Sequence, residues 1–259
     1  MSVITYLQSR ASNAVLSTME KRTIDTSIAT IKTRLEAYFG TGLSSQLRFG
    51  SSTRDTILPR SMDEHSDIDY LVVFSESGYA PQTYLDRLKR FAEKYYASSE
   101  IKQSSPSIVL QLNHIKFDLV PALKQEWWSS SYRIPNGPSA WQDTDPNEFN
   151  KTLNEKNAAE LYMVKPAIRL VKFWNADRGY IYDSYGLEKY IVGQSFYGVN
   201  NIREYVFTSI DSLTLRYDQP QYRKDRLARA KEIIAEVRNL EKEGYPNLAE
   251  TEVKKLIPA

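Results

Sequence analysis

The segment 49–74, FGSSTRDTILPRSMDEHSDIDYLVVF, restricts the possible folds more than any other part of the chain. Its last eight residues begin with Asp67 and Asp69 and are then apolar at every position, as expected of a central strand in a sheet. Side chains two residues apart in a strand share a face, so the two carboxylates point the same way, with Cα atoms roughly 7 Å apart. Two anions held in this way repel one another unless a cation lies between them.

A third aspartate lies in a later predicted strand. SIVLQL (107–112) and IKFDLV (115–120) are predicted as two strands joined by a two-residue hairpin turn, and Pro121 is expected to end the second. Asp118 stands between apolar residues of that second strand, which needs an explanation. Three strand carboxylates can hold two Mg²⁺ or Mn²⁺ ions, an arrangement suited to nucleotidyl transfer.

A structural explanation of the three carboxylates competes with the metal site. Asp67 would cap a turn after Ser66, Asp69 would lie at the sheet edge, and Asp118 would pair with a lysine or arginine. The combination of the aspartate pair, the third strand aspartate and a preceding Gly-Ser turn favours the metal site. In that turn, Gly50 allows backbone N–H groups to approach a phosphate and the Ser51 hydroxyl adds a donor, with Arg54 as a further candidate.

The rest of the chain divides into a mixed α/β front half and an all-helical back half. A helix is predicted over 3–39, ended by glycines, and another from Pro81 to about 96. The segment 127–145 is rich in Trp, Ser, Pro and Gly and is taken as the boundary region. We therefore predict an α+β fold with a catalytic domain over 1–140, including the N-terminal helix, and a helical domain over 141–259.

Composition excludes several classes of site. The 259 residues contain no cysteine, so disulfides and thiolate metal sites are ruled out and oxygen ligands are expected for any metal. A net charge of +2 gives no strong signal for nucleic-acid binding. The sequence shows no apolar run long enough for a membrane span and no signal peptide, and we expect a cytoplasmic protein.

Three cations of the helical half recur at helical spacing. Lys165, Arg169 and Lys172 are expected to share one face of a helix, without acidic neighbours, where a triphosphate would neutralise them. The alternative is ordinary surface charge. Further along, Ser184 and Tyr185 open another predicted helix, whose N-terminus would attract an anion while the tyrosine ring stacks on a base.

The motifs resemble a known superfamily. Gly50-Ser51, fifteen residues, and then Asp67-Ile68-Asp69 with an apolar strand are similar to the DNA polymerase beta-like nucleotidyltransferases. GSSTRDTILP, SDIDYLVVF and FDLVPA resemble the bacterial branch of cGAS/DncV-like nucleotidyltransferases (CD-NTases) of anti-phage signalling, relatives of oligoadenylate synthases. Asp55 stands where that branch often has a glycine before the threonine. The resemblance covers most of residues 46–200.

The resemblance implies a polymerase beta-like mixed sheet and a template-independent synthase that joins NTPs into a cyclic di- or trinucleotide for a separate effector protein. It implies that Asp67, Asp69 and Asp118 hold two Mg²⁺ or Mn²⁺ ions and that Gly50 and Ser51 bind the β and γ phosphates. It also implies that Lys172, Ser184 and Tyr185 hold the donor nucleotide, in a cleft between the two halves. An activator is possible but is not specified. The alternative functions are an enzyme that transfers NMP to tRNA, protein or a small molecule, and a catalytically inactive nucleotide sensor.

Overall fold

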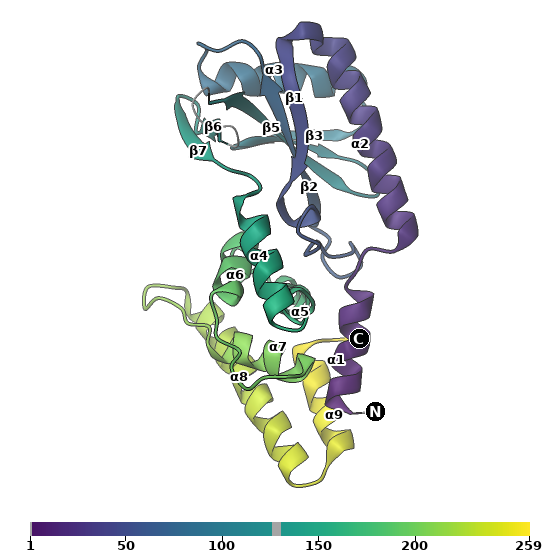
Figure 1. Cartoon of the computed structure of the whole chain (residues 1–259), viewed down its shortest axis with the longest axis vertical. Coiled ribbons are helices and arrows are strands. Elements are labelled where there is room, and N and C mark those ends of the chain that lie inside the picture. The colour runs from purple at the N-terminus through teal and green to yellow at the C-terminus, as the bar shows by residue number, and fades with distance from the viewer. Residues whose placement is uncertain (1, 126–130) are drawn as a thin grey trace. The chain divides into compact units, whose positions relative to one another are not determined.

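The computed structural model of the chain describes residues 2–125 and 131–259, which divide into two compact units (Figure 1). The sheet unit consists of Leu16–Arg60 and Glu64–Lys151. The helical unit consists of Met1–Val15, Ser61–Asp63 and Thr152–Ala259. This division differs from the predicted boundary at residue 140, because the first helix packs with the C-terminal helices and the last strands of the sheet extend past residue 140.

The sheet unit is built on one mixed sheet, in the order β1-β2-β5-β4-β3, with β6 joining the end of β5 and β7 pairing with β6. The pair β2–β5 is parallel, and the other pairs are antiparallel. The strands are β1 (Leu43–Phe49), β2 (Asp67–Phe74), β3 (Glu100–Ser104), β4 (Ser107–Gln111), β5 (Lys116–Lys124), β6 (Tyr132–Asn136) and β7 (Ala140–Thr144).

The predicted strand 67–74 is confirmed as β2, and the hairpin around Asn113-His114 as β4 and β5. The prediction that Pro121 ends its strand is wrong, because β5 continues to Lys124. Pro121 lies beyond the last residue of β5 that pairs with β4 and opposite Val72 of β2, so its missing N–H interrupts no pairing to β4.

Two helices, α2 (Thr18–Phe39) and α3 (Pro81–Tyr95), accompany the sheet (Figure 1). They pack their apolar faces against one face of β2 and β5 and form the main core of this unit. The core residues of that face include Ile68, Tyr70, Val72, Phe74, Phe117 and Leu119 from the strands, and Leu35, Leu88 and Phe91 from the helices. The opposite face of the same strands carries a smaller cluster of Leu71, Val73, Val120 and Ala122.

The single helix predicted over 3–39 is in fact two helices, α1 (Val3–Asn13) and α2. Ser17 and Glu20 form a capping box, in which the Ser17 hydroxyl accepts from the Glu20 N–H at 3.2 Å and the Glu20 carboxylate accepts from the Ser17 N–H at 2.8 Å. This cap starts a new helix and leaves 14–17 as a break. Gly40 ends α2 with a φ of +55°, as predicted.

The segment 127–145, predicted to hold the boundary, instead contains β6 and β7 in its described part, while residues 127–130 lie outside the described residues. Beyond it the chain is helical, as predicted. The remaining helices are α4 (Glu148–Ala159), α5 (Val164–Asp177), α6 (Ser184–Val192), α7 (Ile202–Asp211), α8 (Gln221–Lys242) and α9 (Pro246–Leu256). Tyr6 of α1 donates a hydrogen bond to the carbonyl of Ile257 at 2.7 Å, which ties the N-terminal helix to the C-terminal end within the helical unit. None of the helices in the described residues is long and apolar enough to cross a membrane.

Candidate active site

Three aspartates lie on one face of two adjacent strands in the sheet unit. Asp69 of β2 is directly opposite Asp118 of β5 in the parallel register, and Asp67 is opposite Lys116. All four side chains lie on the face away from the main core, in the same rows as Leu71, Val73, Val120 and Ala122. The predicted convergence of Asp67, Asp69 and Asp118 on one face is thus seen in the structure.

Gly50 lies against this row. It follows Phe49, the last residue of β1, which pairs with Asp69. Gly50 has a φ of +73°, and a Cβ built there would lie 1.8 Å from Asp69 Oδ2 and 2.7 Å from its Cγ. The residue must therefore be glycine for two reasons, its left-handed backbone and the carboxylate that occupies the space of a side chain.

The carboxylates raise one another's pKa. Burial, with the charges of Asp67 and Asp118, raises the pKa of Asp69 to about 8, while Arg54 acts in the opposite direction. Burial and the charge of Asp67 likewise raise the pKa of Asp118 to about 6. Burial and mutual repulsion thus disfavour the charged forms of Asp69 and Asp118, and a bound cation would offset both effects.

Lys116 lies beside the aspartates, and no role was predicted for it from the sequence. Its Nζ lies 2.9 Å from Asp67 Oδ2 and 3.8 Å from Asp118 Oδ1. Burial lowers the pKa of Lys116, but Asp67 and Asp118 raise it by more, so the ammonium form is favoured. The alternation of side chains along β5 places Lys116 and Asp118 on one face, and this signal was available in the sequence.

The donor set fits a hard divalent cation. All three side chains offer carboxylate oxygens, the ligands preferred by Mg²⁺ and Mn²⁺. Asp118 Oδ1 is buried and accepts no hydrogen bond from the described residues, so it has a coordination position to offer. In the described part of the chain, however, no three or more acidic or histidine side chains are already grouped to hold a metal ion. Mg²⁺ usually keeps several waters and is bound by one or two carboxylates together with substrate phosphates.

The turn that carries Gly50 and Ser51 is a short 3₁₀ helix, Gly50–Ser52. The Ser51 carbonyl accepts hydrogen bonds from the backbone N–H groups of Arg54 at 3.3 Å and Thr56 at 3.1 Å, which fix the loop after the turn. Asp55 in this loop has a φ of +59°, a left-handed backbone conformation that favours glycine. Arg54 is 5 % exposed, lies with its guanidinium carbon 5.7 Å from the ring centre of Phe149, and contributes positive charge near Asp69.

The three predicted cations, Lys165, Arg169 and Lys172, all lie on α5 in the helical unit. Pro166 lies in the first turn of α5, where its missing N–H breaks no helical hydrogen bond. The prediction of a cationic stripe without acidic neighbours is wrong for Lys172, whose Nζ lies 2.8 Å from Glu188 Oε1 of α6. Both side chains are buried, at 6 % and 1 % exposed, and Arg169 is 9 % exposed, because α5 is buried on nearly all sides. Lys165 is half-buried.

Ser184 and Tyr185 form the first turn of α6, as predicted. The N-cap is Asp183, whose carboxylate accepts a hydrogen bond from the N–H of Gly186 at 2.7 Å. The side chain of Tyr185 is 48 % exposed, and Lys189 Nζ lies 5.5 Å from its ring centre. Its ring is thus accessible to a stacking partner.

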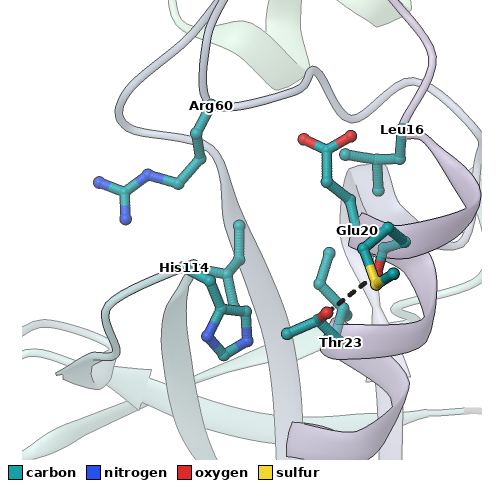
Figure 2. Close-up of a pocket in the computed structure, with 8 residues that line it drawn as sticks. Leu16, Glu20, Thr23, Arg60 and His114 are labelled. Atoms are coloured by element: carbon teal, nitrogen blue, oxygen red, sulfur yellow. Dashed lines mark hydrogen bonds between the residues drawn. The ribbon is translucent and has the colours of Figure 1, made fainter.

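A small pocket of about 100 Å³ lies elsewhere in the sheet unit, beside α2 and the turn before β5 (Figure 2). Ile115, one of its lining residues, alternates with Lys116, so the pocket opens on the face opposite to the aspartates. Its other lining residues are Leu16, Met19, Glu20, Thr23, Ile24, Arg60 and His114. Burial and Arg60 lower the pKa of His114, and the ring approaches Ser27 Oγ at 3.1 Å. None of the predicted site residues lines this pocket.

Comparison with known proteins gives a family match. The Second Messenger Oligonucleotide or Dinucleotide Synthetase domain matches residues 1–157. A probable cyclic nucleotide synthase of Bacillus cereus (strain VD146) is 28% identical over 181 residues, which cover 56% of this chain and 54% of that protein. The chain therefore spans about half the length of this relative.

Solved structures of CD-NTases share the fold. CdnC of Escherichia coli MS115-1, in a complex with HORMA-deltaN, aligns with a TM-score of 0.73 at 16% identity over 100% of this chain and 98% of that one. Apo DncV of Vibrio cholerae aligns with a TM-score of 0.74 at 12% identity, covering 95% and 91% of the two chains. CdnG of Bradyrhizobium diazoefficiens, in complex with GTP, aligns with a TM-score of 0.70 at 14% identity, covering 97% of each chain. At these identities the likeness concerns the α+β fold.

Proposed function

Since the chain belongs to the Second Messenger Oligonucleotide or Dinucleotide Synthetase family, within the cGAS/DncV-like nucleotidyltransferases, we propose that it joins NTPs into a cyclic di- or trinucleotide second messenger of anti-phage defence. The observation that supports this most directly is the carboxylate row, in which Asp69 and Asp118 are register partners and Asp67 shares their face. Gly50 lies in contact range of Asp69, so the turn that we propose to bind phosphate is next to this row.

In the proposed reaction, a ribose hydroxyl of one nucleotide attacks the α-phosphorus of another. A new P–O bond forms, the bond to pyrophosphate breaks, and the hydroxyl loses its proton. Asp67, Asp69 and Asp118 are the residues that would hold two Mg²⁺ or Mn²⁺ ions. Bound metal would supply the positive charge that stabilises the attacking and leaving oxygens. We assign Asp118 to the side of the attacking hydroxyl, as the family resemblance implies.

Nucleotide binding is assigned to two sets of residues. In the sheet unit, Gly50 and Ser51 are proposed to contact the β and γ phosphates, since a glycine turn lets backbone donors approach an anion closely. Arg54 is buried beside Asp69, and we propose that it acts there through its charge. In the helical unit, Ser184 and the accessible ring of Tyr185 are proposed to hold the donor nucleotide and stack on its base.

The cations of α5 complete the proposed nucleotide contacts. Lys165 is half-buried and Arg169 largely buried, and both are assigned to the triphosphate. Lys172 is proposed for the same role in spite of its ion pair with Glu188, which a bound triphosphate would have to compete with.

The proposed partners are NTP substrates, a separate effector protein that responds to the product, and an activator. Relatives of the same fold were solved with GTP and with ATP, which makes purine NTPs the first substrates to test. CdnC was solved with a HORMA protein, so a protein of that kind is the first activator to test.

The test is a synthesis assay. The protein is incubated with all four NTPs, each α-³²P-labelled in turn, with Mg²⁺ or Mn²⁺, and the products are separated after phosphatase treatment. We expect a phosphatase-resistant small product from the wild type and none from the double variant Asp67→Asn, Asp69→Asn. Asp25→Asn, an exposed aspartate of α2, serves as the matched control and should retain full activity.

Two outcomes would contradict the proposal. Product formation by the double variant would refute the assignment of the site. Label transferred to added tRNA or protein, with no small product, would favour the NMP-transferring alternative, because that reaction needs a macromolecular acceptor.

A further inference from the structure

The ammonium group of Lys116 forms ion pairs with two of the three aspartates. Its Nζ is within 2.9 Å of Asp67 and 3.8 Å of Asp118, and these two side chains are 28 % and 22 % exposed. In the parallel register Lys116 stands opposite Asp67, one pleat along from the pair Asp69–Asp118, so all four side chains share one face. An ammonium and a divalent cation cannot share the same carboxylate oxygens at contact distance without strong repulsion.

The ion pair engages one carboxylate of the row more closely than the other. Asp67 is engaged by Lys116, while Asp118 Oδ1 is buried and accepts no hydrogen bond from the described residues. Asp67 Oδ2 is thus the oxygen that Lys116 contacts directly, at 2.9 Å, whereas Asp118 Oδ1 lies farther from the ammonium, at 3.8 Å.

We propose that Lys116 is a positioning residue, an internal counter-cation that neutralises the aspartate row in the metal-free protein and must give up Asp67 before a divalent cation binds. This inference rests on one part of the proposed function, the assignment of Asp67, Asp69 and Asp118 as the metal ligands. It gives Lys116 two opposite effects, since the ammonium stabilises the metal-free row and lowers its affinity for metal. A lysine with a merely structural role would support folding and metal binding together.

The test measures binding of Mn²⁺ alone, without nucleotide, by isothermal titration calorimetry, together with the Tm of the metal-free protein. Lys116→Met is expected to bind Mn²⁺ roughly tenfold more tightly than the wild type, since one neighbouring positive charge is removed. The same variant is expected to lose about 2–4 °C in metal-free Tm, because Asp67 loses its partner. Lys116→Arg keeps the charge and should bind Mn²⁺ as the wild type does.

Lys124→Met is the matched control, since this lysine is at the exposed end of the same strand and should change neither quantity. Unchanged or weaker Mn²⁺ binding by Lys116→Met would overturn the proposal, and so would a wild type that binds no Mn²⁺. If Lys116→Met fails to fold, Lys116→Gln is measured in its place, with the same tightening expected.

The synthesis assay separates this inference from the proposed function. A wild type that makes cyclic product, with Lys116→Met binding Mn²⁺ no more tightly, refutes the role of Lys116 alone. Tighter Mn²⁺ binding by Lys116→Met, with NMP transferred to a macromolecule by the wild type, supports the role of Lys116 and refutes the proposed product.

Discussion

Gly50→Ala should damage both the stability and the chemistry of the sheet unit. The φ of +73° at Gly50 is unfavourable for any residue with a Cβ, at a cost of about 1–2 kcal/mol. The added methyl group would lie 1.8 Å from Asp69 Oδ2 and 2.7 Å from its Cγ, so the carboxylate must move. Overpacking of this kind costs about 1–3 kcal/mol. The free energy of unfolding should therefore fall by roughly 2–5 kcal/mol in total.

Gly137→Ala is the matched control for this prediction. Gly137 lies in the same unit with a φ of +80°, but a Cβ there would meet nothing within 4 Å. The control should lose only the backbone contribution, about 1–2 kcal/mol, and should keep full synthesis activity. The difference between the two variants in urea-induced unfolding isolates the overlap with Asp69.

The chemical consequence is measured on the folded fraction of Gly50→Ala, at a temperature where the variant is still native by circular dichroism. Displacement of Asp69 should reduce synthesis by at least about a hundredfold, because misplaced catalytic groups lose rate steeply. The reasoning is refuted if Gly50→Ala unfolds no more easily than Gly137→Ala and still makes product.

The remaining predictions concern charge. The pKa values of Asp69 and Asp118 are raised to about 8 and about 6, so the native state binds more protons than the unfolded state above pH 4. The stability of the metal-free protein should therefore fall as the pH rises from 4 to 8. Saturating Mg²⁺ should make the Tm depend less on pH in thermal unfolding. Asp69→Asn should abolish synthesis. It should nevertheless raise the free energy of unfolding of the metal-free protein at pH 8.5 by about 1–2 kcal/mol, because it removes a buried charge close to two other carboxylates. A loss of stability at that pH would contradict the raised pKa of Asp69. Lys172→Met should cost about 3–5 kcal/mol, because it removes the ammonium from the buried ion pair with Glu188, and the double variant with Glu188→Leu should recover most of that loss. Equilibrium dialysis of the folded double variant then shows whether the Lys172 ammonium binds NTP.

Short-range patterns predicted much of the fold. The apolar run after Asp69 identified β2, and the two-residue spacing at Asn113-His114 identified the β4–β5 hairpin, because each depends only on neighbours in sequence. The resemblance to the CD-NTases is confirmed by the family match, and the mixed α+β fold by the solved relatives.

The errors in the fold came from signals that compete locally. The capping box at Ser17 was overlooked because helical periodicity continues on both sides of it. Pro121 was taken as a strand end, although only its position beyond the β4 pairing makes it acceptable inside β5. The strands β3, β6 and β7 are short and largely exposed, so they lack the apolar pattern by which strands are predicted.

The site shows where sequence patterns stop being informative. The two-residue period of a strand determines which side chains share a face, so the sequence was enough to place Asp67, Asp69 and Asp118 on one face of their strands. Spacing does not fix what stands opposite that face. Lys172 was predicted on a cationic stripe of one helix without acidic neighbours, whereas the packing of α6 supplies Glu188 as its partner. Simple alternation along β5 places Lys116 on the same face as Asp118. Its contact with Asp67, however, depends on the parallel register of β2 and β5, two strands that are about fifty residues apart in the chain. Only the folded sheet defines that register.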